Sequence, residues 1–352
     1  MPAYNHRPFI AEAIESVLKQ STPFPFELLI GEDASTDGTL AVAASYQKLR
    51  PDVVRIVHEN RNVGMVSNLR RLIEQARGDY IAFCEGDDYW LPGDGLARRI
   101  ALLEATPTAG LVHSNYAISR QVLGKWRQFP SARTLGIDRS PTSGAVFSTV
   151  FSALPNLTCT TVYRREPLAD WLDAEISRAD DRLVDLCLSA LCASKWNFAY
   201  LDEVTAVYRL SPRSATRSGS ARRLQFELNR LDIYLRFYRR FGHRADFDKG
   251  FEQIVYRDIC DAAFWAGDRA TFETYSALAD ARGIHRYRVK RAIARAPLAR
   301  SAAAAWEGVI KLRTQAGLIA SLFCTKTSES KGWLRPICGI SRVGKPDAGG
   351  EC

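Results

Sequence analysis

Strand and helix signals alternate over residues 1–115 of this 352-residue chain, and this alternation constrains the fold more than any other feature. Three short apolar runs are typical of buried strands: 26–30, 53–57 and 80–84. Apolar residues at helical spacing predict three helices, over 7–20, 39–49 and 68–77. The pattern favours an α/β fold in which a mostly parallel, Rossmann-like sheet is flanked by helices.

The following part of the chain is less periodic. Residues 116–160 contain several prolines, and we expect loops and short strands there, around a binding site for a second substrate. A helix is predicted over 185–194, and strands are predicted over 196–201 and 204–208. These elements continue the α/β pattern to about residue 210.

A segment rich in Ser, Arg and Pro at 211–220 reads as a linker, and the pattern after it is helical. We therefore predict a main α/β domain over 1–210, a linker over 211–220 and a helical, basic C-terminal extension over 221–352. The extension carries the charge of the chain, because residues 282–345 hold 14 Lys or Arg against two Glu, while the whole chain has a net charge of +9.

This uneven charge bears on the partners. The main domain is close to neutral, so we expect no nucleic acid partner. Apolar residues at helical spacing over 305–323, next to basic residues, are compatible with a helix that lies peripherally on an anionic membrane face. The alternative, which we prefer, is a helix that packs on the main domain and turns a basic face to water.

The cysteines and the hydropathy indicate a compartment. The chain has eight cysteines, none of them in a C-x-x-C pair, which is typical of reduced thiols in a cytosolic protein. No signal peptide and no apolar run long enough to span a bilayer is visible. We expect a cytoplasmic protein, with peripheral contact at the inner membrane face if the tail binds lipid.

Acidic clusters follow two of the predicted strands. Glu32 and Asp33 come directly after the first apolar run, and Glu85, Asp87 and Asp88 come after the third. Ligands bind at the carboxyl ends of parallel strands, and buried carboxylates there are costly unless a cation neutralises them. Carboxylates together with diphosphate oxygens suit Mg²⁺ or Mn²⁺. The sequence therefore predicts a divalent metal site that binds a diphosphate.

Each acidic loop alone has a simpler interpretation. Asp and Asn are frequent in turns because their side chains bond to the local backbone, and Ser35 or Asp37 would cap the following helix. Two acidic loops, each after a strand of the same α/β unit, favour the functional interpretation.

Six sequence pieces in a fixed order resemble one protein family. They are Pro2-Ala3-Tyr4-Asn5, Ile14-Glu15-Ser16-Val17-Leu18 with Gln20, Glu32-Asp33-Ala34-Ser35-Thr36-Asp37-Gly38-Thr39, Asn62-Val63-Gly64 with Asn68, Gly78-Asp79-Tyr80-Ile81-Ala82-Phe83, and Gly86-Asp87-Asp88-Tyr89-Trp90. In this order they resemble the family 2 inverting glycosyltransferases of the GT-A fold, of the bacterial polysaccharide and glycolipid type. The match is dense over 1–115 and thins toward 210.

The resemblance implies a transfer of a sugar from a nucleotide diphosphate donor, expected to be a UDP-sugar, to a hydroxyl of a saccharide or lipid-linked acceptor. Asp33 would bind the base, Asp87 the Mg²⁺ or Mn²⁺ ion and the donor, and Asp88 would be the second metal ligand. The other residues expected at the donor come from the matching pieces: Pro2, Ala3, Tyr4, Asn62, Gly64 and Asn68.

The resemblance also implies a carboxylate base at the start of a helix that is followed by a strand and a Tyr-Arg pair. On that spacing the base is Asp185, because Tyr208-Arg209 follows the predicted strand. Asp181 and then Asp180 are rivals, and a carboxylate that merely caps the helix is the structural alternative. The His that often follows Tyr-Arg in the family is absent, which leaves a contact of this segment with the diphosphate open.

The start of the chain departs from the family. An apolar strand normally precedes Pro-x-Tyr-Asn, whereas here Met1 takes that place, so either Met1 is internal to a longer product or the protein is a weakened copy. A degenerate, non-catalytic nucleotide-sugar binder is therefore one alternative function. Another is a sugar-nucleotide nucleotidyltransferase, although residues 1–8 lack the glycines that such a phosphate loop needs.

Overall fold

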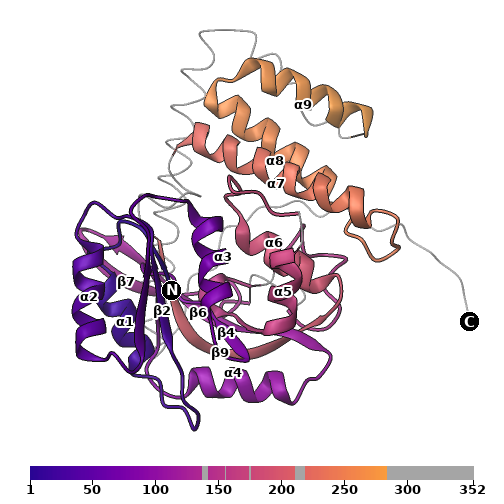
Figure 1. Ribbon diagram of the computed structural model, residues 1–352. Coiled ribbons are helices and arrows are strands. Elements are labelled where there is room, and N and C mark those ends of the chain that lie inside the picture. The colour runs from indigo at the N-terminus through magenta and orange to yellow at the C-terminus, as the bar shows by residue number, and fades with distance from the viewer. Residues whose placement is uncertain (137–141, 155, 174–175, 211–218, 284–352) are drawn as a thin grey trace, which may run out of the picture. The chain divides into compact units, whose positions relative to one another are not determined.

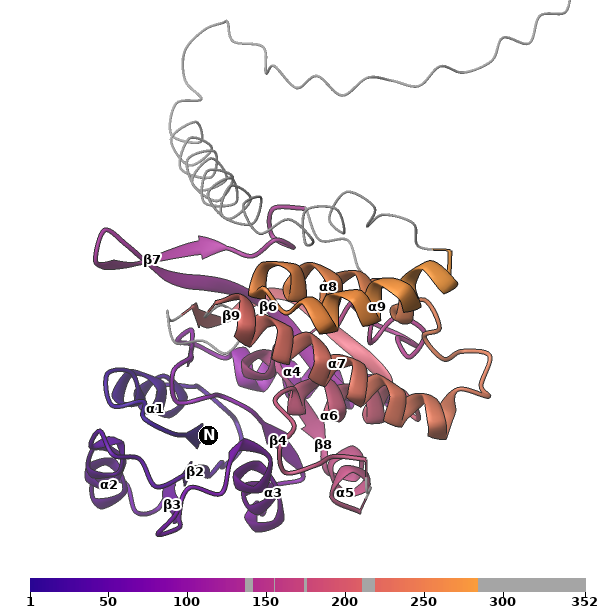
Figure 2. The ribbon, with the colours of Figure 1, turned by 90° about the horizontal axis from the view of Figure 1, so that it is seen from above.

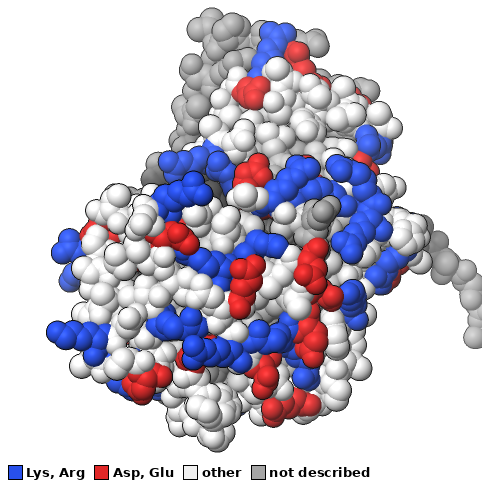
Figure 3. Space-filling view, in the orientation of Figure 1, with Lys and Arg blue, Asp and Glu red and all other residues white. Residues whose placement is uncertain are grey.

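The computed structural model describes residues 1–136, 142–154, 156–173, 176–210 and 219–283 (Figure 1). The amphipathic segment predicted at 305–323 and most of the basic tail lie outside these residues. Among the described residues, no helix has both the length and the apolar character needed to cross a membrane. Acidic side chains are interspersed among basic ones on the face shown in Figure 3.

The first sheet is parallel and has the order β1-β2-β3. Its strands are β1 (Pro2–Ala3), β2 (Leu28–Glu32) and β3 (Val54–His58). The helices that follow them are α1 (Ile10–Leu18), α2 (Thr39–Leu49) and α3 (Met65–Gln75). All five residues of β2 are buried, as expected of a parallel strand covered on both faces. The strand begins two residues later than predicted and includes Glu32, whose carboxylate is bonded locally.

The second sheet is mixed and has the order β4-β8-β6-β9-β5, with β7 paired to β6. Its strands are β4 (Tyr80–Ala82), β5 (Tyr89–Trp90), β6 (Ala109–Val122), β7 (Lys125–Pro130), β8 (Val162–Arg164) and β9 (Asn197–Leu210). Only β6 and β9 pair in parallel, and the other pairs of this sheet are antiparallel. The predicted α/β class is confirmed, while the parallel character is confined to the first sheet and to β6–β9.

Two local predictions can be compared with the structure. Residues 116–130, where loops and short strands were expected, form the end of the long strand β6 and the short antiparallel strand β7, joined at Leu123 and Gly124, which both have positive φ. The strands predicted at 196–201 and 204–208 form one continuous strand, β9. The pairing register between β6 and β9 shifts near Asn115, so the polar residues between the two predicted strands do not interrupt β9. Local periodicity does not reveal such irregular pairing.

The remaining helices cover the second sheet and form a C-terminal layer (Figure 2). They are α4 (Gly95–Glu104), α5 (Arg165–Asp173), α6 (Val184–Ala193), α7 (Ser220–Phe241), α8 (Phe251–Ala266) and α9 (Arg269–Ala281), with a short 3-10 helix at Thr158–Thr160. Phe151 packs edge-on against Tyr234 and Phe237 of α7, and Ser152 donates to Asp248. Helix α7 therefore packs against the α/β domain. The linker predicted at 211–220 falls largely outside the described residues.

Candidate active site

A pocket of about 950 Å³ opens where the loop after β1, the turn between β4 and β5, the start of α6 and the side of α7 meet. Its polar and aromatic lining includes Tyr4, Asn5, His6, Asp37, Glu85, Asp87, Asp88, Trp126, Cys159, Arg182, Asp185, Tyr208 and Phe226. The pocket therefore brings together the acidic turn and the base candidate, which are about a hundred residues apart in sequence.

Five carboxylates line this pocket, Asp37 and the group formed by Glu85, Asp87, Asp88 and Asp185. Burial, followed by repulsion from Asp87, raises the pKa of Glu85 to about 7. Burial also raises the pKa of Asp88 well above its usual range, and the charges of Asp87 and Glu85 add to that effect. Such a cluster is destabilised by its own charge and becomes favourable when a cation binds it. The residues present therefore fit a Mg²⁺ or Mn²⁺ ion.

Asp87 is the accessible member of the acidic turn. Its side chain is 33% exposed, and one carboxylate oxygen lies 3.8 Å from Nε2 of His6. The turn approaches the first loop so closely that a Cβ on Gly86 would lie 2.8 Å from both His6 Nδ1 and Ile10 Cδ1. Glycine at this position is what allows Asp87 to reach the pocket beside His6.

The side chain of Asp88 is more deeply buried than that of Asp87. One of its carboxylate oxygens accepts the backbone N–H of Arg209 at 2.8 Å. Glu85, Asp88 and Cys159 each offer one ligand atom, and these atoms lie within 4.8 Å of one another. Burial raises the pKa of the Cys159 thiol well above its usual range, and sulfur is a soft ligand that Mg²⁺ and Mn²⁺ disfavour. The hard carboxylate oxygens are the donors suited to a cation here.

The structure separates the three candidates for the base. Asp185 lies in the first turn of α6 and lines the pocket, and burial raises its pKa. Asp181 is 4% exposed, and its carboxylate accepts from the guanidinium of Arg236 through both oxygens. Asp180 is exposed and does not line the pocket. Asp185 also does not cap α6, whose N-cap residue is Leu183, so it is the one available carboxylate of the three.

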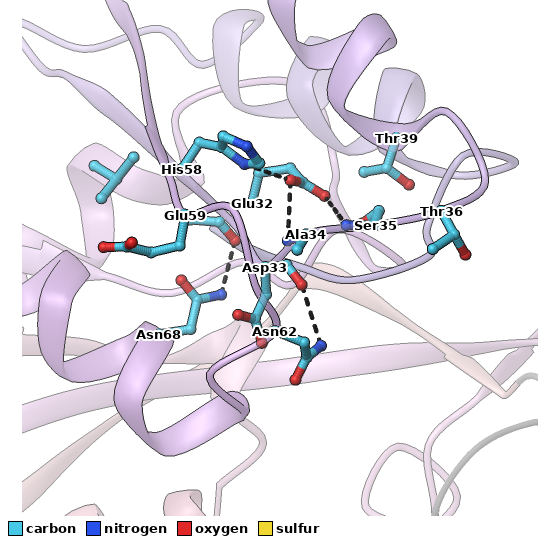
Figure 4. A network of polar contacts seen from close by, with 12 residues as sticks. Glu32, Asp33, Ala34, Ser35, Thr36, Thr39, His58, Glu59, Asn62 and Asn68 are labelled. Atoms are coloured by element: carbon cyan, nitrogen blue, oxygen red, sulfur yellow. Dashed lines mark hydrogen bonds and ion pairs between the residues drawn. The ribbon is translucent and has the colours of Figure 1, made fainter.

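The loop after β2 is built around two buried carboxylates (Figure 4). Glu32 accepts the backbone N–H groups of Ala34 and Ser35 and contacts His58 Nδ1 at 2.9 Å. Asp33 accepts the N–H groups of Val63 and Gly64 at 2.8 and 3.0 Å. These bonds join the predicted donor residues Asp33 and Gly64 in one rigid corner.

Other predicted donor residues take different positions. Asn62 donates to the carbonyl of Asp33 at 3.1 Å, in the same corner. Asn68 is buried beneath the loop and donates to the carbonyl of Gly31 at 2.8 Å, so its position indicates a supporting role and not a direct donor contact. Ala3 is also buried, Pro2 is half-buried, and Tyr4 is 46% exposed and lines the pocket. Asp37 accepts the N–H of Thr39 at 3.0 Å, but the N-cap residue of α2 is Gly38 and it makes no side-chain cap bond, so neither Ser35 nor Asp37 is the N-cap.

Residues 1–172 match the sequence model of glycosyl transferase family 2. This part of the chain belongs to that family. One relative, the putative glycosyltransferase EpsE of Bacillus subtilis, is 38% identical over 104 residues, which cover 30% of this chain and 37% of EpsE. The putative teichuronic acid biosynthesis glycosyltransferase TuaG of the same organism is 37% identical over 89 residues, covering 25% of this chain and 34% of TuaG.

A longer match is an uncharacterized protein of Mycobacterium tuberculosis, 30% identical over 227 residues. The match covers 64% of this chain, and the chain spans 61% of that protein's length. Among solved structures, the mannosyltransferase PcManGT of Pyrobaculum calidifontis in complex with GDP-Man and Mn²⁺ is similar with a TM-score of 0.54 at 18% identity, covering 87% of this chain and 86% of that chain.

TarS of S. aureus in complex with UDP-GlcNAc is similar with a TM-score of 0.52 at 19% identity, covering 75% of this chain and 71% of that chain. At these identities the likeness concerns the fold, which is the GT-A fold expected of a family 2 domain. The family match ends at residue 172, so Asp185 and α7 lie beyond it. The roles of these later residues rest on the geometry of the pocket.

Arg209 supports the acidic turn of the family 2 domain from behind. Its guanidinium donates to the carbonyl of Asp87 and to the carboxylate of Glu12, each at 2.6 Å. Three aromatic rings surround the guanidinium at 4.6–5.4 Å, and they belong to Phe9, Tyr89 and Trp126. Only 5% of Arg209 is exposed. This residue positions the turn, and it does not line the pocket in which a diphosphate would lie.

Sequence reasoning missed His6, Arg209 and Arg236 as parts of the site. His6 directly follows the Pro-x-Tyr-Asn piece, so its place in the loop was a usable signal. Arg209 was noted only as half of a Tyr-Arg pair. Arg236 lies on α7, outside the predicted main domain, and nothing in the local pattern connects it with Asp181.

Helix α7 holds the loop that leads to Asp185. The guanidinium of Arg236 is bonded to the carboxylate of Asp181 and to the carbonyl of Ile176. The backbone N–H of Arg182 donates to Asn229 of α7 at 2.9 Å. The Asp181–Arg236 pair is almost completely buried, with side chains 1% and 6% exposed. The position of the base candidate thus depends on a buried ion pair with the C-terminal layer.

We expect Arg236→Met to destabilise the protein by about 3–5 kcal/mol, because it leaves the Asp181 carboxylate buried without its partner. The measurement is the midpoint of thermal unfolding. Arg178→Met is the matched control, because Arg178 pairs with Asp232 at the surface, where an ion pair contributes about 0–1 kcal/mol. Equal midpoints for the two variants would contradict the role given to the buried pair.

Proposed function

We propose that this chain transfers a sugar from a nucleotide diphosphate donor to an acceptor hydroxyl, with inversion at the anomeric carbon. The observation that carries the proposal is the convergence of Glu85, Asp87, Asp88 and Asp185 on one pocket of a family 2 domain. Three of these carboxylates come from one turn after β4, and Asp185 approaches from α6. The arrangement supplies an acidic donor site and a separate base.

The acidic turn would hold the metal. Asp87, with Asp88 and Glu85 behind it, would bind Mg²⁺ or Mn²⁺, which offsets the negative charge that develops on a departing diphosphate. Arg209 keeps the turn in place through the carbonyl of Asp87 and the carboxylate of Asp88. The turn therefore has its geometry before a donor binds, which is what electrostatic stabilisation of a leaving group requires.

Asp185 would accept the proton of the acceptor hydroxyl as that oxygen attacks the anomeric carbon. Attack opposite to the leaving diphosphate inverts the configuration in a single displacement. Burial raises the pKa of Asp185, which makes the ionised carboxylate a stronger base than an exposed aspartate. Phe226 and Arg182 also line the pocket and would contact the acceptor.

The similar proteins indicate the classes of donor and acceptor. The similar folds bind UDP-GlcNAc in TarS and GDP-Man with Mn²⁺ in PcManGT, which supports a nucleotide diphosphate sugar. We propose a UDP-sugar, with Tyr4 beside the nucleotide. The similarity to TuaG, a putative glycosyltransferase of teichuronic acid biosynthesis, supports an acceptor in cell-surface polysaccharide or glycolipid synthesis. Such a reaction would take place on the cytoplasmic side, with a saccharide or lipid-linked acceptor.

The first test is calorimetric titration of the full chain with UDP, with and without Mn²⁺. We expect UDP to bind at least about ten-fold more tightly when Mn²⁺ is present, because the cation bridges carboxylates and diphosphate. The release of UDP from UDP-sugars then measures turnover. Failure to bind UDP, GDP and dTDP would refute the donor site, and donor binding without any turnover would favour the degenerate binder.

A further inference from the structure

The hairpin of β6 and β7, residues 117–130, contributes to the lining of the active-site pocket. Gln121 of β6 and Trp126 of β7 are paired directly across the hairpin, and both line the pocket. Figure 2 shows that the hairpin extends away from the rest of the second sheet, on the side where α1 lies. One face of a two-stranded ribbon therefore forms this wall of the pocket.

The two faces of the hairpin differ in charge. Side chains alternate between the faces of a strand, so the face that carries Gln121 and Trp126 also carries Ser119 and Gln128, and it holds no charged residue. The basic residues of the hairpin all belong to the opposite face: Arg120, Lys125 and Arg127. The pocket thus meets an indole and neutral polar groups at this wall, which suits an uncharged ligand better than a phosphate or a carboxylate.

The ring of Trp126 is fixed by its neighbours. The ring of Phe9 packs against it edge-on, with 5.7 Å between the ring centroids, and the guanidinium of Arg209 lies 5.4 Å from the centroid of the indole. Because Arg209 does not line the pocket, the indole turns another side toward it. A ring that is already held in place loses little conformational freedom when a ligand packs on it.

The polar groups beside the ring are available to a ligand. Within the part of the chain that the structure describes, neither the indole N–H of Trp126 nor the side-chain amide of Gln121 makes a hydrogen bond. Trp126 is half-buried and Gln121 is exposed, so both groups can be reached from the pocket. A flat apolar ring next to free amide groups is an arrangement that binds sugars, because the C–H face of a pyranose packs on the ring while its hydroxyls bond to the amide.

We propose that Trp126 and Gln121 form a subsite for a neutral pyranose ring of the acceptor. The inference rests on the proposed function and narrows it, since the acceptor must then present a sugar ring to the hairpin. The sugar of the donor is not the occupant, because water has to be kept from its reactive carbon, whereas an acceptor chain has to leave the pocket. The exposed side chains of Gln121 and Gln128 leave that way open.

The test measures the binding of methyl glucoside, methyl galactoside, methyl mannoside and methyl N-acetylglucosaminide to the full chain by saturation-transfer NMR. We expect at least one of these sugars to bind, and Trp126→Ala to weaken that binding at least about five-fold, while Trp126→Phe retains most of it. Gln121→Ala should weaken it about three-fold. Phe129→Ala is the matched control and should leave it unchanged, because Phe129 lies on the same strand but on the opposite face and outside the pocket.

The affinity for UDP with Mn²⁺ separates a sugar contact from a purely structural role of Trp126. We expect Trp126→Ala to change this affinity by less than about two-fold, because the bonds from Arg209 to Asp87 and Glu12 remain. Equal losses of UDP and sugar binding would overturn the proposal, as would sugar binding that survives Trp126→Ala or the absence of sugar binding. If sugar binding depends on Trp126 but no form binds a nucleotide, the sugar subsite stands and the proposed function fails.

Discussion

Asp185→Asn is expected to lower turnover about 10³-fold while changing the affinity for UDP by less than about two-fold. The amide keeps the shape of the side chain and can still accept the N–H of Leu186, as the carboxylate does at 2.9 Å. It cannot take a proton from the acceptor hydroxyl. Turnover is measured as the release of UDP from the donor in the presence of acceptor, and affinity by calorimetric titration.

Asp180→Asn is the matched control, because Asp180 lies in the same loop region but is exposed and outside the pocket. We expect it to retain turnover within about two-fold of the unmodified protein, as surface substitutions usually do. Wild-type turnover in Asp185→Asn would contradict the assignment of the base. Asp181 would not be the natural replacement, because its carboxylate is bound by Arg236 through both oxygens.

The pH dependence gives a separate test of Asp185. Burial raises its pKa above the usual value of an aspartate, and the base acts in its ionised form. The turnover rate should therefore be maximal above this raised pKa, and it should fall as the pH decreases through the pKa. The acid limb of the pH–turnover profile should lie at a higher pH than the usual range of an aspartate and should be absent from the residual activity of Asp185→Asn.

The sequence predicted those parts of the site that depend on short stretches of chain. The acidic turn after β4 was predicted because an apolar run ends directly before Glu85, and parallel strands place their carboxyl ends at a binding edge. Asp185 was predicted from its spacing to Tyr208-Arg209. In both cases the signal lies within about 25 residues, and the family resemblance supplied the role.

The parts that were not predicted depend on contacts between distant residues. Arg209 meets Glu12 and Phe9 from the first helix region, although almost 200 residues separate them. The buried pair Asp181–Arg236 joins a loop to a helix that seemed to belong to another domain. Such partners are set by tertiary packing, which local periodicity and propensity do not encode. The bond from Asn68 to Gly31 on another element is a further contact that the sequence pattern did not indicate.

Asp87→Asn is expected to reduce Mn²⁺-dependent UDP binding at least about 30-fold and turnover at least about 10²-fold. Asp87 is the exposed carboxylate of the acidic turn, so its loss removes the charge that a cation would meet first. The carbonyl of the same residue, which accepts from Arg209, is unaffected by the substitution. Calorimetric titration with UDP, with and without Mn²⁺, measures the loss.

The thermal stability of Asp87→Asn distinguishes the loss of a metal ligand from damage to the fold. Repulsion from Asp87 contributes to the raised pKa values of both Glu85 and Asp88, so removing its charge relieves strain in the metal-free protein. The thermal midpoint of metal-free Asp87→Asn should be unchanged or higher, while the stabilisation by Mn²⁺ is lost. Asp79→Asn, an exposed residue before β4, is the control for the change in charge. Full Mn²⁺ dependence in Asp87→Asn would move the metal to Glu85 and Asp88.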